Sequence, residues 1–203
     1  MEEVKKWECG QIISRFVIAE LKGYTLYISG SGNMTDFNKY APWYKESILN
    51  VIIEDGITNI GNNDFSRCIG IKTVAIGANV KYIGNSAFSG CSNLIEIDIP
   101  KTVSEIGVYA FISCRNLKSI TLPESVRNIG DNFINYTSSL STVVNHSLVP
   151  QVISSKTFYG EKDYELYVPR ESIELYKSTL YWKNFKTILA IEDMYNDLSP
   201  FDS

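Results

Sequence analysis

The stretch IGNSAFSGCSNLIEIDIP, residues 83–100, decides the fold because copies of its first half recur on both sides at one spacing. IGNNDFSRC ends at Cys68, IGNSAFSGC at Cys91 and IGVYAFISC at Cys114, which makes the period 23 residues. A fourth copy, IGDNFINYT, begins at Ile129, with its phenylalanine one place early and a threonine in place of the cysteine. A fixed period of this length predicts stacked repeat units.

Apolar columns carry the same period beyond the quoted words. The columns are 71, 94, 117 and 140; 74, 97, 120 and 143; 76, 99 and 122; and 57, 80, 103 and 126. Four full units therefore run from about residue 48 to 139, and a fifth begins at Leu140. We expect an N-terminal cap over 1–47, repeats over 48–144, and an irregular loop with a C-terminal cap over 145–203.

Each unit combines an extended piece with a turn. In Leu94-x-x-Ile97-x-Ile99 the apolar residues alternate, which predicts a short strand with Glu96 and Asp98 pointing outward. A second extended piece is expected over 103–106. The alanine–phenylalanine pair and the residues up to the cysteine predict a helical or 3₁₀ turn. Such a unit buries its apolar side only by stacking, which predicts a solenoid of α+β but β-leaning character.

Three further columns are expected to build the structural ladder. The glycines predict a backbone site of positive φ or close approach, the phenylalanines fill the core, and the cysteines pack as small buried residues. These columns are Gly61, Gly84, Gly107 and Gly130; Phe65, Phe88 and Phe111; and Cys68, Cys91 and Cys114.

The pattern L-x-x-I-x-I/L-P-x-x-V-x-x-I-G-x-x-A-F-x-x-C resembles the BspA-like leucine-rich repeat, a bacterial repeat of 23 residues. The resemblance covers 48–140, and the segments 24–61 and 164–193 resemble the lead-in and closing segments of that family. Asp64 departs from the pattern, because alanine is expected there. The resemblance implies a leucine-rich-repeat solenoid with an exported, cell-surface or secreted role in binding and adhesion.

The flanks predict caps for the open ends of the solenoid. All three tryptophans, Trp7, Trp43 and Trp182, lie outside 48–140, as expected of side chains that cover terminal repeats. YTLYISGSGNM, from Tyr24, predicts a strand that enters a glycine-rich turn as a small hairpin. The spacing of Ile173, Tyr176, Leu180 and Phe185 predicts an amphipathic helix over the last repeat, whereas 145–163 predicts an irregular loop.

Composition and spacing disfavour most kinds of chemistry. The cysteines lie too far apart for a zinc site, although a Cys68–Cys91 or Cys91–Cys114 disulfide remains open. His146 is the only histidine and has no nucleophile motif near it, so that catalysis is the least favoured hypothesis. A net charge of −4 argues against nucleic-acid binding. We expect no cofactor, no metal and no transmembrane segment.

What remains is the outward strand face. It is expected to present Asn50, Ile52, Thr73, Ala75, Glu96, Asp98, Ser119, Thr121, Thr142 and Val144. We select Thr73, Glu96, Asp98, Ser119 and Thr121 as candidate binding residues for an extracellular protein or glycan. A structural or scaffold role is the alternative. The N-terminus lacks the pattern of a secretory signal, which leaves a cytoplasmic location as a second hypothesis. A monomer fits the sequence, and the oligomeric state stays open.

Overall fold

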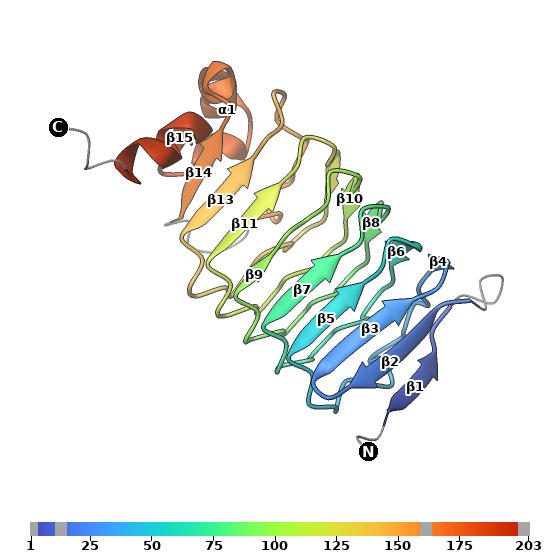
Figure 1. Ribbon diagram of the computed structural model, residues 1–203. Helices are drawn as coiled ribbons and strands as arrows, with labels where there is room; N and C mark the ends of the chain where they lie inside the picture. Colours follow the sequence, from blue (N-terminus) through green and yellow to red (C-terminus); the bar gives the residue numbers. More distant parts are fainter. Residues whose placement is uncertain (1–3, 11–15, 159–163, 199–203) are drawn as a thin grey trace.

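The computed structural model describes residues 4–10, 16–158 and 164–198. The strands lie side by side in a solenoid, with the two termini at opposite ends (Figure 1). The predicted solenoid is confirmed. It contains little helix, so that the α+β expectation overestimated the helical content.

One face of the solenoid is built from two sheets. Its first sheet contains β1 (Lys5–Glu8), β2 (Ile18–Lys22), β3 (Thr25–Ser29), β5 (Asn50–Ile53), β7 (Thr73–Ile76) and β9 (Glu96–Ile97). A second sheet continues with β11 (Ser119–Leu122), β13 (Thr142–Asn145), β14 (Glu165–Val168) and β15 (Ile188–Ala190). The strands from β3 onward are parallel within each sheet, because every unit returns the chain to the same start.

The pairing register repeats the period of the sequence. Asn50 pairs with Thr73, Thr73 with Glu96, and Ser119 with Thr142, each 23 residues apart. Between β9 and β11 the amide of Lys118 donates to the carbonyl of Ile95 at 3.3 Å, ahead of both strands. The face therefore runs across both sheets.

The second face holds shorter strands. They are β4 (Gly32–Asn33), β6 (Ile57–Ile60), β8 (Tyr82–Ile83), β10 (Glu105–Ile106) and β12 (Asn128–Ile129). In the third unit the extended piece expected over 103–106 is thus limited to its last two residues.

The segments from glycine to cysteine are hydrogen-bonded turns, which corrects the predicted helical or 3₁₀ turn. The amide of Cys91 donates to Phe88 O at 3.1 Å, but the amide of Phe88 donates to Ala110 O of the next unit at 2.9 Å. Ser86 and Gly90, whose amides also donate to the next unit, have left-handed backbones with φ of 55° and 73°. Because every second amide points to the neighbouring unit, a helix cannot propagate.

The glycine column is explained by close approach and not by backbone conformation. None of its four members has a positive φ: Gly61, Gly84, Gly107 and Gly130. A Cβ on Gly107 would lie 2.5 Å from the amide nitrogen of Asn85, and one on Gly130 would lie 2.3 Å from that of Val108. No side chain fits between backbones at these distances.

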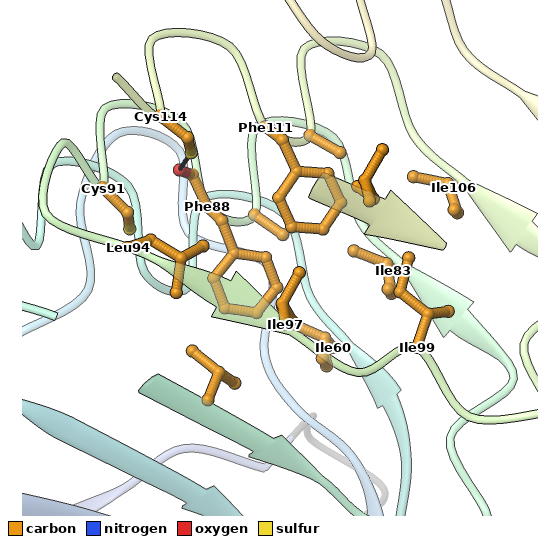
Figure 2. Close-up of a cluster of buried hydrophobic side chains, with 14 of the residues drawn as sticks. Ile60, Ile83, Phe88, Cys91, Leu94, Ile97, Ile99, Ile106, Phe111 and Cys114 are labelled. Atoms are coloured by element: carbon orange, nitrogen blue, oxygen red, sulfur yellow. Dashed lines mark hydrogen bonds between the residues drawn. The ribbon is translucent and has the colours of Figure 1, made fainter. Parts of the chain in front are cut away.

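A row of aromatic rings runs through the core. The rings of Phe65 and Phe88 stack with centroids 5.1 Å apart. Those of Phe88 and Phe111 stack at 5.3 Å (Figure 2). The ring of Phe133 meets Phe111 edge-on at 89°, because its one-residue shift changes the direction of the side chain. Trp43 contacts Phe65 at one end, and Trp182 contacts Phe158 at the other.

At the N-terminal end the hairpin is not where the sequence predicted it. Residues 25–29 form the expected strand, but β3 pairs antiparallel with the preceding β2. After the turn at Gly30, residues 32–33 cross to the second face, where β4 pairs with β6. The glycine-rich segment is therefore a corner of the solenoid. At Gly30, where φ is 104°, a Cβ would lie 1.6 Å from Phe16 O.

At the C-terminal end the predicted single helix is broken. The segment contains η1 (Arg170–Ser172), α1 (Ile173–Ser178) and η2 (Trp182–Asn184), and η3 (Ile191–Leu198) follows β15. The helix α1 ends at Ser178 because Thr179 is extended, with φ −79° and ψ 135°, and Leu180 beyond it is 61% exposed rather than buried. Tyr176 and Phe185 are buried as expected.

The fifth unit replaces its second strand with an irregular segment. In earlier units the hydroxyls of Thr102 and Ser125 donate to Val80 O and Val103 O. Leu148 occupies the same column, but its side chain has no hydrogen-bond donor. The buried side-chain amide of Gln151 donates to Val126 O instead, at 3.0 Å. The irregular loop expected over 145–163 holds for 146–158, and its last five residues lie outside the described chain.

Candidate functional site

The candidate binding residues lie along the outward strand face. Thr73 begins β7, Glu96 begins β9 and Ser119 begins β11, and all three are exposed. Asp98 follows β9 and is exposed, whereas Thr121 in β11 is half-buried. The first three share one register position in successive units, because strand alternation places every second side chain on the same face.

A shallow hollow of about 380 Å³ lies on this face. The lining residues at alternate strand positions, which point outward, are Thr25, Tyr27, Asn50, Ile52, Thr73, Ala75, Glu96 and Asp98. Ser119 and Thr121 lie outside the hollow, in the second sheet. The structure thus brings Thr73, Glu96 and Asp98 together and separates them from the other two candidates.

Two lining residues come from outside the period and were missed by the sequence argument. Thr25 and Tyr27 belong to β3, which pairs with β5 in the same register as the repeats. The alternation Thr25-Leu26-Tyr27-Ile28 is the signal that could have found them, since Leu26 and Ile28 are fully buried. The Lys22 ammonium lies 5.3 Å from the centroid of the Tyr27 ring.

The far end of the face differs from the prediction at one residue. Val144 was expected to point outward, but only 6% of it is exposed, and the following Asn145 is fully buried. The side-chain amide of Asn145 donates to Gln151 Oε1 at 2.8 Å, which ties this strand to the irregular segment. Val144 therefore adds no exposed surface to the face.

Polar contacts on the face restrain its side chains. The Thr73 hydroxyl donates to Asn50 Oδ1 at 2.8 Å. At the N-terminal edge Glu20 accepts hydrogen bonds from Lys22 and Lys6, and these two contacts lower its pKa to about 2. Glu96 and Asp98, in contrast, form no ion pair within the part of the chain that the structure describes.

The cysteines are held as buried thiols. Cys9, Cys68, Cys91 and Cys114 are all free and buried. Cys91 Sγ donates to Phe65 O at 3.1 Å. Cys114 Sγ donates to Phe88 O at 3.2 Å (Figure 2). Burial raises the pKa of Cys68 and Cys114 to about 12 and that of Cys91 well above its ordinary value. A thiol in this state is a poor nucleophile.

Asp64 is the buried exception in the alanine column. Its Oδ2 accepts a hydrogen bond from the Gly61 amide at 2.6 Å, while Oδ1 has no partner. Desolvation raises the pKa of this carboxyl well above its usual range. The side chain is fully buried and does not reach the outward strand face.

The remaining candidates for chemistry bring no reactive groups together. His146 is exposed, and its backbone amide donates to Leu122 O at 3.0 Å. Within residues 4–10, 16–158 and 164–198 no three metal-ligating side chains gather. None of the helices described in those ranges has the length and apolar character needed to cross a bilayer.

Solved structures with the same fold are bacterial leucine-rich repeat proteins. One from Eubacterium ventriosum has a TM-score of 0.71 at 24% identity, over 85% of this chain and 46% of its own. The pneumococcal vaccine antigen PcpA has a TM-score of 0.68 at 19% identity, over 82% of this chain and 41% of its own. A leucine rich cell surface protein from Faecalibacterium prausnitzii is 26% identical, with a TM-score of 0.53, over 81% of this chain and 49% of its own.

The chain therefore spans less than half the length of each of these three proteins. No curated protein sequence matches it significantly. The family model described as BspA type leucine rich repeat region matches residues 35–188 in 6 copies. Since this match covers most of the chain, and the strands, turns and core columns repeat accordingly, the protein belongs to the BspA-type leucine-rich repeat family.

Proposed function

We propose that the chain is a non-enzymatic binding module of a bacterial surface or secreted protein. It contacts a protein or glycan partner through the outward strand face. The family points to a repeat module for binding or scaffolding, and the cell-surface protein of F. prausnitzii supports an exported setting.

The hollow over β3, β5, β7 and β9 is the observation that carries the proposal. Short side chains such as Thr73 and Ala75 let a partner come close to the sheet. Tyr27 and Ile52, which is 37% exposed, offer apolar contact area, and Glu96 and Asp98 offer acceptors for donor groups of the partner. A surface with these properties can bind a partner without catalysing a reaction on it.

A matched pair of charge reversals tests the face. Glu96 and Glu105 each begin a two-residue strand and are exposed, but they lie on different faces. The purified chain is first screened on an array of matrix proteins and glycans. For the partner found there, Glu96→Lys and Ala75→Arg are expected to weaken binding at least about tenfold, whereas Glu105→Lys leaves it within about twofold.

Equal loss in Glu96→Lys and Glu105→Lys would move the binding site away from this face. Absence of any saturable binding on the array would favour the scaffold alternative, in which the repeats only space or anchor other parts of a larger protein. An active-site role of His146 is contradicted when His146→Ala leaves every measured activity and binding constant unchanged.

A further inference from the structure

Two stacked tyrosines and three cations form a compact surface cluster on the turn side of the solenoid, away from the outward strand face. The rings of Tyr40 and Tyr44 stack at 4.5 Å with an interplanar angle of 22°. Lys39 Nζ and Arg67 Cζ lie 5.4 and 5.6 Å from the Tyr40 centroid, and Lys45 Nζ lies 5.5 Å from the Tyr44 centroid. We call Lys39, Tyr40, Tyr44, Lys45 and Arg67 the basic tyrosine cluster.

Two segments that are distant in sequence build the basic tyrosine cluster. The turn over 41–46 is closed by backbone hydrogen bonds from Tyr44 to Ala41 and from Glu46 to Trp43. It faces the first repeat turn, where the buried Trp43 indole donates to Asp64 O at 2.9 Å. Arg67 has φ 59°, and its stem lies over Gly90, where a Cβ would be 3.5 Å from Arg67 Cγ.

The three cations of the cluster have no counter-ion among the residues that the structure describes. Lys39, Lys45 and Arg67 are exposed and form no ion pair with any residue that the structure describes. Neighbouring lysines behave differently, because Lys5 pairs with Glu46 at 2.7 Å and Lys6 with Glu20 at 2.8 Å. The cluster therefore gathers three positive charges without ion-pair partners among the described residues in one place, on a chain of net charge −4.

The tyrosine rings hold these charges in place. A cation over an aromatic face is stabilised by the ring quadrupole, so that fewer rotamers are lost when the cation binds an anion. Lys39 and Arg67 lie at the Tyr40 ring and Lys45 lies at the Tyr44 ring, so that the three cations are spread along the ring stack. A chain that carries several anionic groups matches this arrangement.

We propose that the basic tyrosine cluster binds a sulfated polysaccharide chain. Lys and Arg donate charge-assisted hydrogen bonds to sulfate oxygens, and the Arg67 guanidinium can do so with two donors. Single-stranded nucleic acid needs aromatic faces that are free for stacking, but the faces of Tyr40 and Tyr44 are taken by each other and by the cations. A sulfated glycan needs only the charges.

The test uses a heparin octasaccharide as probe, titrated calorimetrically into the chain at about 50 mM and about 300 mM salt. The triple variant Lys39→Gln, Lys45→Gln and Arg67→Gln is expected to bind at least about tenfold more weakly at low salt. Its matched control, Lys101→Gln, Arg115→Gln and Lys118→Gln, removes the same charge from three exposed cations elsewhere and stays within about twofold. Thermal melts check that both triple variants fold. If the triple variant of the cluster does not fold, the single variant Arg67→Gln replaces it.

Tyr40→Leu keeps every charge but removes the ring that holds Lys39 and Arg67, and it is expected to weaken binding about threefold. Equal weakening by the two triple variants, or no saturable binding of the octasaccharide at low salt, would overturn the proposal. If polyglutamate binds as tightly as the octasaccharide, the proposal is also overturned, and the cluster is assigned to an acidic peptide instead. Glu96→Lys, on the outward strand face, is expected to leave octasaccharide binding unchanged, which separates this test from the test of the proposed function.

Discussion

At the residue scale the most unusual position is Asp64, which occupies the column of Ala87 and Ala110. Those alanines are fully buried and need no partner, whereas Asp64 buries one carboxylate oxygen that has none. Its other oxygen accepts from Gly61, whose counterpart Gly84 donates to the preceding unit at Ile60 O instead. Asp64 thus satisfies a backbone amide where regular stacking begins.

Asp64→Asn is expected to remove a pH dependence of stability. Because the folded-state pKa of Asp64 is raised, its contribution is fully present below the unfolded pKa, about 4, and is lost as pH rises through the folded pKa. Relative to the asparagine variant, the wild-type chain should lose unfolding free energy as the pH rises from about 4 toward 7. Urea titrations across this range measure the difference. Parallel curves for the two proteins would show that the carboxylate remains ionised in the fold.

At the element scale the turn segments determine how closely the units stack. The turn from Gly84 to Cys91 donates toward the following unit through Ser86, Phe88 and Gly90, while strand amides such as Ile95 donate toward the preceding unit. Each unit is therefore bound to both neighbours by backbone hydrogen bonds. The glycine column sits where two of these backbones come too close for a Cβ.

Gly107→Ala and Gly90→Ala form a matched pair for this argument. The Cβ at 107 would meet backbone of the preceding unit at 2.5 Å, so we expect a loss of about 2 kcal/mol or more. At Gly90 the Cβ has room, and only the positive φ is strained, which costs about 1 kcal/mol. Urea unfolding of both variants measures the two losses. A larger loss at Gly90 than at Gly107 would contradict close approach as the reason for the column.

At the scale of the whole molecule the two ends differ from the repeats that they cover. Trp7 packs against Trp43 at 5.9 Å at one end. At the other end Trp182 donates from its indole nitrogen to Gln151 O at 2.7 Å and lies against Tyr176 and Phe185. A solenoid without such covers exposes apolar side chains and unpaired strand edges.

Trp182→Ala is expected to cost about 3–5 kcal/mol, because a fully buried ring that contacts Phe158 is lost. It should also promote end-to-end association, measured as concentration-dependent size in light scattering. Leu180→Ala is the control, since that side chain is 61% exposed and its removal is expected to change stability by less than about 0.5 kcal/mol. A Trp182 variant as stable as the control would mean that the end of the solenoid is covered by other contacts.

The sequence by itself determined the solenoid, its period and the inward and outward residues of each unit, because the columns follow from strand alternation and from the need to bury one side of every unit. The division into 1–47, 48–144 and 145–203 stays a prediction. Only the tertiary structure decided that the turns are not helical, that Val144 is covered and that the hollow joins Thr25 and Tyr27 to Glu96 and Asp98. It alone also brought Arg67 onto Tyr40, 27 positions away in the printed sequence. The hollow and the contact of Arg67 with Tyr40 depend on packing between a regular unit and an irregular flank, where no period relates the two partners. The turns depend instead on hydrogen bonds between neighbouring units.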